Sequence, residues 1–316
     1  YPLLLQTRIK ILICGPGITV LRRMGLESLF RAHSVPEQGL RLVDGADRSW
    51  GYFPANRTGK GRQNFTTDFE IMRGDLCALL VEETKTRGVM YMFGGHAAVN
   101  RKKNGVHSLG ILAGYFTMPR PIQPGEEYTA SVFIGTGGCG VMMRRHEAGR
   151  VQVYLLCETD ELGKAAREGI WRQRRKGWRR RSAILTGFAE TDDFDAERMG
   201  VVRVEGWSRG RVVLVGDAAY APSAQTGMGT SSGMVGAYIL AGEIGRSCGQ
   251  GSNLADNGDL AMALKMYESL HEEVSVILTG DYSGVCPLCS RVVLETGSRC
   301  PMDAARGDQG VGTPAV

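Results

Sequence analysis

The sequence predicts an α/β fold, in which a discontinuous domain of strands and helices encloses an inserted antiparallel sheet. Strand-and-helix patterns lie near both ends of the chain, at residues 9–33 and 212–244. Between them, apolar runs over 115–158 are separated by proline and glycine clusters, a pattern typical of antiparallel strands. The 316 residues are 43% hydrophobic and 22% charged, which indicates a globular chain of one or two domains.

The first part of the chain alternates between strand and helix patterns. Residues 9–15 read IKILICG, an apolar run that predicts a buried strand. Apolar residues near helical spacing predict one helix over 20–33. Segment 70–84 predicts the end of a strand followed by a helix, and 88–95 predicts a further strand.

The middle of the chain predicts the inserted sheet. Apolar runs at 115–118, 128–135 and 151–158 predict its strands, and the last of these runs partly alternates. Residues 161–185 return to a helical, highly charged pattern.

The most informative segment is 211–230, which reads RVVLVGDAAYAPSAQTGMGT. Residues 212–215 are a continuous apolar run, as expected of a buried parallel strand. An acidic turn and a glycine-rich turn follow, and helices are predicted over 231–244 and 263–278. Glycines at a helix start let a ligand approach the backbone N–H groups at the positive end of the helix dipole. An ordinary strand, loop and helix remains the alternative interpretation.

This segment resembles the third FAD motif of the para-hydroxybenzoate hydroxylase-like, single-component flavin monooxygenases. The matching residues are Gly216, Asp217, Ala218, Ala219, Pro222, Gly227, Gly229 and Thr230. The resemblance extends over most of residues 9–280. It implies a Rossmann-like FAD/NAD(P)-binding domain and an inserted substrate domain. It also implies a monooxygenase that uses NAD(P)H and O₂ to oxygenate an aromatic or polyketide-like substrate in secondary metabolism.

The resemblance also implies roles for individual residues. The N–H groups of the segment Gly227, Met228, Gly229 and Thr230 would stabilise negative charge on the flavin ring, and Asp217 would hold the ribityl chain. Pro222 would line the face where oxygen reacts. Arg73, in the string RGDL, would contact the FAD phosphate region, because a guanidinium makes planar, bidentate phosphate contacts. The alternative for Arg73 is an exposed arginine at a helix start, paired with Asp75.

Two positions depart from the family pattern. Gly15 and Gly17 fit the dinucleotide fingerprint GxGxxG, but Val20 stands at its third glycine. The helix pattern follows at once, without the roughly 30 residues that a βαβ unit needs, so residues 15–20 predict a junction across an internal deletion. Asn104 stands where the family has an aspartate that serves FAD and NAD(P)H, although a simple Asn-Gly turn explains it equally well.

Two rival functions follow from these departures. One is a truncated, inactive flavoprotein relic or a non-catalytic binding module that has lost FAD. The other is a flavin-free NAD(P)-dependent oxidoreductase, against which the Gly216-Asp217 motif argues.

The resulting prediction is an FAD-binding domain over 1–106 and 183–280, a substrate domain over 107–182 and an irregular tail over 281–316. The only implied partner is a small-molecule substrate, and the oligomeric state is not predicted.

Composition argues against several other classes. The net charge of +5 comes largely from the run at 172–181, which predicts a solvated helix face rather than a nucleic-acid site. No apolar stretch approaches the roughly 18 residues of a membrane helix. The opening apolar run, interrupted by Arg8, is too short for a signal peptide. Eight scattered cysteines are typical of a reduced, cytoplasmic protein, and Cys286, Cys289 and Cys300 lack a fourth zinc ligand at a standard spacing.

Overall fold

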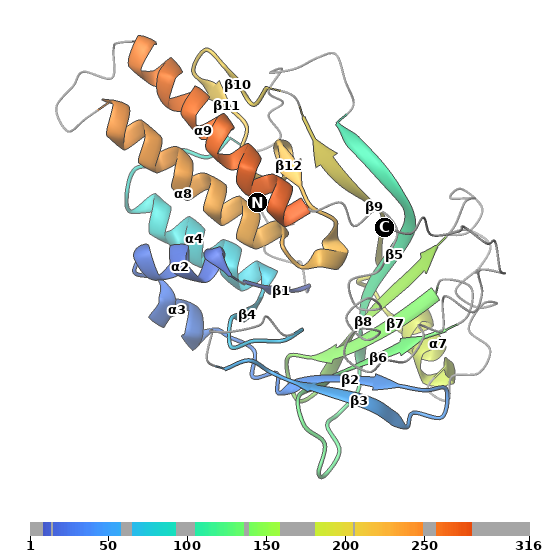
Figure 1. Ribbon diagram of the computed structural model, residues 1–316. Helices are drawn as coiled ribbons and strands as arrows, with labels where there is room; N and C mark the ends of the chain where they lie inside the picture. Colours follow the sequence, from blue (N-terminus) through green and yellow to red (C-terminus); the bar gives the residue numbers. More distant parts are fainter. Residues whose placement is uncertain are drawn as a thin grey trace, which may run out of the picture.

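The computed structural model of the protein describes residues 9–13, 15–57, 65–92, 105–135, 139–158, 181–204, 206–248 and 257–279. A group of helices packs at one side of the molecule, and a long mixed sheet forms the other side (Figure 1). Asn104, residues 161–180, the tail cysteines and the tail itself lie outside the described residues, and so do the predictions made for them.

The helical side begins with a short pair of strands that are far apart in the sequence. Strand β1 (Lys10–Leu12) pairs antiparallel with β4 (Glu70–Met72). Helices α2 (Pro16–Arg23) and α3 (Glu27–Ala32) follow β1 along the chain, and α4 (Arg73–Lys85) follows β4. Their buried apolar side chains form one core cluster, which includes Ile13, Leu21, Phe30, Phe69 and Ile71.

The prediction of a single helix over 20–33 is wrong in its bounds. Helix α2 begins at Pro16, whose fixed φ suits the first turn of a helix. It ends before Gly25, which has φ +74°, a left-handed conformation that interrupts an α-helix and favours glycine. A second short helix, α3, then begins at Glu27.

The large sheet has eight strands in the order β12-β9-β5-β8-β7-β6-β2-β3. Its strands are β2 (Gly39–Val43), β3 (Ser49–Pro54), β5 (Val106–Pro119), β6 (Thr129–Ile134), β7 (Cys139–Arg145), β8 (Arg150–Glu158), β9 (Asp195–Arg203) and β12 (Tyr220–Ala221). All their pairings are antiparallel except that of β2 with β6. The predicted strands of the inserted sheet are therefore confirmed, as parts of β5, β6 and β8.

The sheet reaches further along the chain than the inserted segment alone. Strands β2 and β3 come from residues 39–54, ahead of the insert, and extend the sheet beyond β6. Strands β9 and β12 extend it at the other end, and β12 lies within the motif at 216–230. The proposed domain boundaries stay predictions.

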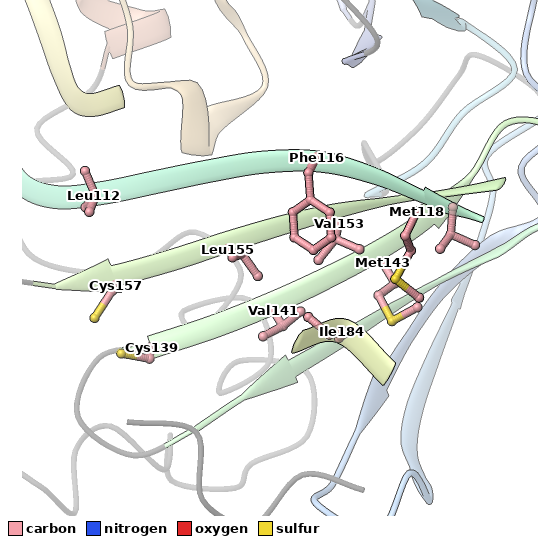
Figure 2. Packing of buried hydrophobic residues seen from close by; sticks show 11 residues of the cluster. Leu112, Phe116, Met118, Cys139, Val141, Met143, Val153, Leu155, Cys157 and Ile184 are labelled. Atoms are coloured by element: carbon pink, nitrogen blue, oxygen red, sulfur yellow. The ribbon is translucent and has the colours of Figure 1, made fainter. Parts of the chain in front are cut away.

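One face of the sheet is packed against helix α7 (Arg181–Glu190). Figure 2 shows Phe116, Met118, Met143, Val153 and Leu155 gathered with Ile184 of this helix. Successive side chains of a strand point to opposite faces, so alternate residues of β5, β7 and β8 form this core. Their neighbours, such as Tyr154 and Arg144, face the helical side of the molecule and contact Lys10 there.

Two predicted strands are wrong as stated. Of the strand predicted over 88–95, residues 88–92 form none, and 93–95 lie outside the described residues. Met90 and Met92 are 92% and 91% exposed, because no described strand lies beside them. Residues 212–215 form a two-residue strand, β11 (Val212–Val213), which pairs antiparallel with β10 (Ser208–Arg209). In the described part of the chain β11 has no parallel neighbour, because β1 pairs with β4 instead.

Two long helices complete the fold, and both were predicted. Helix α8 (Gly229–Cys248) and helix α9 (Asn257–Thr279) lie side by side (Figure 1). Tyr267 of α9 is fully buried and packs with Trp207 and Tyr220. Its hydroxyl donates to the carbonyl of Leu214 at 3.2 Å and shares a 2.9 Å hydrogen bond with Tyr220. This residue therefore ties α9 to the chain segment that precedes the motif.

The same described residues contain no helix that is long and apolar enough to cross a membrane. Nor do they bring together three or more potential metal-ligating side chains. Cys77, Cys139 and Cys157 form no disulfide with any described cysteine, and the last two lie in the sheet core (Figure 2).

We predict that Tyr267→Phe lowers the free energy of unfolding by about 1 kcal/mol, since it removes the buried hydroxyl that bonds Leu214. Urea denaturation followed by circular dichroism measures this loss. Tyr238→Phe is the control, because that hydroxyl is exposed and makes only a 3.5 Å contact with Arg23. Equal stability of the two variants would contradict the proposed role of the buried hydroxyl.

Candidate functional site

The acidic turn after β11 is held by two glycines that approach each other closely. Residues Gly216–Ala218 form a 3₁₀ turn, and Gly216 has φ +65°. A Cβ built on Gly216 would lie 3.7 Å from the Cα of Gly233 in helix α8. The turn therefore packs directly on the helix, and glycine suits position 216 because of its backbone conformation.

Asp217 lies exposed at the tip of this turn. Its carboxylate makes no hydrogen bond or ion pair with any other described residue. An ionised carboxylate is an acceptor only, so Asp217 is available to accept hydrogen bonds from the hydroxyl groups of a ligand.

The glycine-rich turn is ordered by its own hydrogen bonds. The Ser223 hydroxyl accepts from the N–H of Gln225 at 3.3 Å, and the Thr226 hydroxyl donates to the Ser223 carbonyl at 2.8 Å. The Thr226 hydroxyl also accepts from the N–H of Met228 at 3.1 Å. Gly227 follows with φ +66°, and Pro222 is buried at the start of the loop. The loop thus reaches α8 in a defined conformation before any ligand arrives.

Helix α8 presents its N-terminus at this loop. Its first helical bond runs from the N–H of Ser232 to the carbonyl of Met228 at 2.8 Å. The N–H groups of Gly229 and Thr230 come before it, so they have no acceptor within the helix. The first turn contains no acidic residue. The positive end of the helix dipole is therefore not offset by a carboxylate of the helix itself.

The residues of the GxGxxG fingerprint lie at the start of α2, which packs near the N-terminus of α8. Gly15 precedes α2 with φ +51° and is exposed. A Cβ on Gly17 would lie 3.0 Å from both Ile13 and Ser231, so Gly17 is a contact point between α2 and α8. A Cβ on Gly227 would lie 3.8 Å from Leu12 of β1. Strand β1 is therefore adjacent to the motif, whereas the space beside Gly17 is already filled by atoms of Ile13 and Ser231.

Arg73 stands at the first position of α4, and its backbone N–H donates to the carbonyl of Ile9 at 2.9 Å. Its guanidinium makes no ion pair with Asp75 or with any other described carboxylate. It is therefore available for an anion. Because Met72 pairs with Lys10, Arg73 lies at the beginning of β1, whereas Gly15 follows its end.

A buried ionic network, which the sequence did not reveal, joins β1 and β4 to the sheet. Lys10 bonds Glu37 and Glu70, and Arg144 of β7 bonds the same two carboxylates at 2.6 Å each. The side chains of Lys10, Glu37 and Glu70 are fully buried, and that of Arg144 is 10% exposed. The sequence offers one signal for this network, which is that Lys10 and Arg144 are charged residues at the edges of two apolar runs.

The charges in this network set the protonation of its members. Burial by itself would raise the pKa of Glu37, but the charges of Arg144 and Lys10 outweigh it, so its pKa lies below the usual 4.5. Burial, with the nearby Arg144 charge, lowers the pKa of Lys10 against the opposing pull of the two glutamates. Two cations and two anions thus balance within one desolvated cluster.

Comparison with known proteins gives the family. Residues 93–253 match the family model described as FAD binding domain. The chain is 36% identical over 316 residues to the FAD-dependent monooxygenase asL4 of Sarocladium schorii, covering 84% of this chain and 73% of that protein. It is 31% identical over 328 residues to the flavin-dependent monooxygenase eupH of Phoma sp, covering 85% and 76%.

Solved structures share the fold. Tetracycline destructase Tet(51) matches with a TM-score of 0.64 and 18% identity, over 85% of this chain and 78% of that one. Klebsiella pneumoniae HpxO, complexed with FAD and uric acid, matches with a TM-score of 0.60 and 15% identity, over 86% and 80%. The matches define an oxidoreductase of the flavoprotein class. The chain belongs to the para-hydroxybenzoate hydroxylase-like FAD-dependent monooxygenases.

The described residues fit FAD unequally. The exposed Asp217, the ordered loop and the N-terminus of α8 fit the flavin ring and the ribityl chain. The adenosine half fits less well, since Gly17 is filled by Ser231 and β1 lacks a parallel neighbour among the described strands.

We predict that Arg144→Met destabilises the fold by about 3–5 kcal/mol, because it leaves two buried carboxylates with a single cation. Arg48→Met is the control, since Arg48 is 79% exposed and its ion pair with Asp44 is screened by solvent. Denaturant titration compares the two. A loss at Arg144 no larger than that at Arg48 would show that the network does not hold the two parts together.

The pH dependence of stability follows from Glu37. Its pKa is lower in the folded state than the usual 4.5, so its contribution is present above about pH 4.5 and is lost as the pH falls through the folded value. We therefore predict that Glu37→Gln flattens the decline of the unfolding free energy below pH 4.5. Thermal melts from pH 7 to pH 3 measure this slope, and an unchanged slope would contradict the assignment.

Proposed function

We propose that this chain transfers one oxygen atom of O₂ to a small organic substrate, in secondary metabolism, with NAD(P)H as reductant. The balanced reaction is substrate–H + O₂ + NAD(P)H + H⁺ → substrate–OH + H₂O + NAD(P)⁺. Bound FAD supplies the redox chemistry, and the protein supplies position and electrostatics. The observation that carries this proposal is the ordered loop at 222–228, which presents the N-terminus of α8 beside Asp217.

Three groups of the chain would act on the flavin end. The N–H groups of Gly229 and Thr230 would bind the electron-rich edge of the flavin ring, where negative charge develops on reduction. Donors fixed in advance stabilise such charge without reorganising. The Asp217 carboxylate would accept hydrogen bonds from the ribityl hydroxyls, and the buried Pro222 would form an apolar wall that excludes water.

The substrate would lie on the face of the sheet opposite the α7 core. Leu12 touches the motif, and two residues earlier the N–H of Lys10 donates to the hydroxyl of Tyr154 at 3.1 Å. The ring of Tyr154 meets that of Tyr115 edge-on, with centroids 5.5 Å apart. The Tyr115 hydroxyl donates to Glu197 at 2.9 Å. This aromatic, hydrogen-bonding face suits an aromatic or polyketide-like molecule.

Two solved relatives of the fold support a small planar substrate class. One holds uric acid and another holds 2-aminobenzoylacetate. The proposed substrate class for this chain is correspondingly a small organic molecule with conjugated or aromatic character.

A second candidate function is a non-catalytic binding module. It is favoured by one observation, the filling of the Gly17 position by Ser231, which leaves the adenosine half without its glycine turn. Arg73, free of any described carboxylate partner, would remain the principal group for the FAD phosphates. The flavin-free alternative is disfavoured by membership of an FAD-dependent family.

We predict that FAD binds weakly and that Asp217→Ala weakens it by about tenfold or more, the effect of losing one charge-assisted hydrogen bond. Asp259→Ala is the control, since it removes an exposed carboxylate from the first turn of α9. Fluorescence quenching of FAD titrated with protein gives the affinities. Submicromolar, stoichiometric binding would contradict the deleted adenosine site, and equal affinity in both variants would remove Asp217 from the site.

NADPH consumption at 340 nm, with FAD in excess and with candidate aromatic substrates, then separates the two functions. Consumption that rises with substrate supports the monooxygenase. FAD binding without consumption supports the binding module.

A further inference from the structure

A small pocket of about 190 Å³ lies at the β2, β6 and β7 end of the sheet. Among the residues that line it are Arg41, Arg120, Arg145, Glu126, Thr129 and Ser131. Arg41 pairs with Ser131 across the sheet, and Ser131 pairs with Met143. Directly paired residues face the same side, and Met143 belongs to the core under α7 (Figure 2). These lining residues therefore face the side of the sheet away from the flavin motif, and Arg144, whose side chain belongs to the ionic network, also borders the pocket.

Arg145 is the most unusual residue of this pocket. Its side chain is only 3% exposed. Its Nη1 atom donates to the backbone carbonyls of Arg120 and Ala148, each at 2.8 Å, which fixes the guanidinium in place. Its Nη2 atom is buried and has no hydrogen-bond acceptor. The same Nη2 atom forms an ion pair with the Glu126 carboxylate at 3.6 Å, which is too long for a hydrogen bond.

An unsatisfied buried donor on a charged group is costly. An acceptor in the pocket would remove this cost. The buried Arg145 guanidinium, which lines the pocket, therefore retains one N–H donor without a hydrogen-bond acceptor in the described part of the chain.

The other arginines define where such a ligand would be held. Arg120 is already engaged by Glu126 at 2.6 Å. Arg41 has no described carboxylate partner, and its Nη2 atom makes only a 3.3 Å bond to the Ser131 hydroxyl. Arg41 and Arg145 thus each keep N–H groups without a hydrogen-bond acceptor among the described residues, and both line the same pocket. The hydroxyls of Thr129 and Ser131 add neutral donors.

We propose that this pocket binds a small oxyanion, a carboxylate or a phosphate, between Arg41 and Arg145. Two oxygens on one centre match the planar fork of a guanidinium. The pocket is smaller than the roughly 300–1,000 Å³ of typical small-molecule sites. It therefore suits an anion with a short organic tail and not a nucleotide. This site is separate from the proposed flavin and substrate face.

Isothermal titration calorimetry of the whole chain tests the site. Sodium phosphate and sodium succinate are titrated separately at constant ionic strength, so that the two arms distinguish phosphate from carboxylate. We expect saturable binding of at least one anion, weakened about tenfold or more by Arg41→Gln. Arg48→Gln is the matched control, because it removes an exposed arginine that follows the same strand and lies outside the pocket.

Arg145→Lys is the second variant, and it keeps the charge while losing the fork. It should weaken binding as well, and far-ultraviolet circular dichroism verifies its fold. Should it unfold, Arg41→Gln still decides the result. The proposal is overturned by the absence of saturable binding, or by equal affinity in the Arg41 and Arg48 variants. It is also overturned if Arg73→Gln abolishes the binding, since the anion would then occupy the flavin phosphate region.

Discussion

The arrangement of this protein depends on one buried ionic network that joins its two parts. Lys10 and Glu70 come from the β1–β4 pair, whereas Arg144 comes from the large sheet and Glu37 precedes β2. Charges removed from water are tolerated only when they are paired and hydrogen-bonded. Because Leu12 of β1 also lies next to Gly227, the network helps to position the motif relative to the sheet.

The two halves of the flavin site differ in how well the chain supports them. At the ring end, a self-bonded loop and two closely packed glycines hold the N-terminus of α8 in place. At the adenosine end, α2 follows β1 directly and packs on α8 through Gly17. Protein atoms of Ile13 and Ser231 therefore fill the space beside Gly17. The affinity of this chain for FAD and the positioning of the flavin ring thus depend on different residues.

The large sheet separates two chemical environments by the alternation of its strands. One face, under α7, is an apolar core that ends in an arginine-lined pocket. The opposite face carries tyrosines, a glutamate and the ionic network, and it lies toward the motif. Strand alternation brings residues adjacent in sequence, such as Met143 and Arg144, into these two different surroundings.

The sequence by itself determined the family, the ring-end motif, the two long helices and the antiparallel strands of the insert. These features depend on local patterns, such as apolar period, glycine position and the strand-to-helix order at 212–244. Only the tertiary structure decided that β2 and β3 join the sheet, that β11 has no parallel partner among the described strands, and that Gly17 packs on Ser231. It alone also brought Lys10, Glu37, Glu70 and Arg144 together. Pairing between strands and between charges distant in sequence depends on which segments meet in space, and local patterns do not encode that contact.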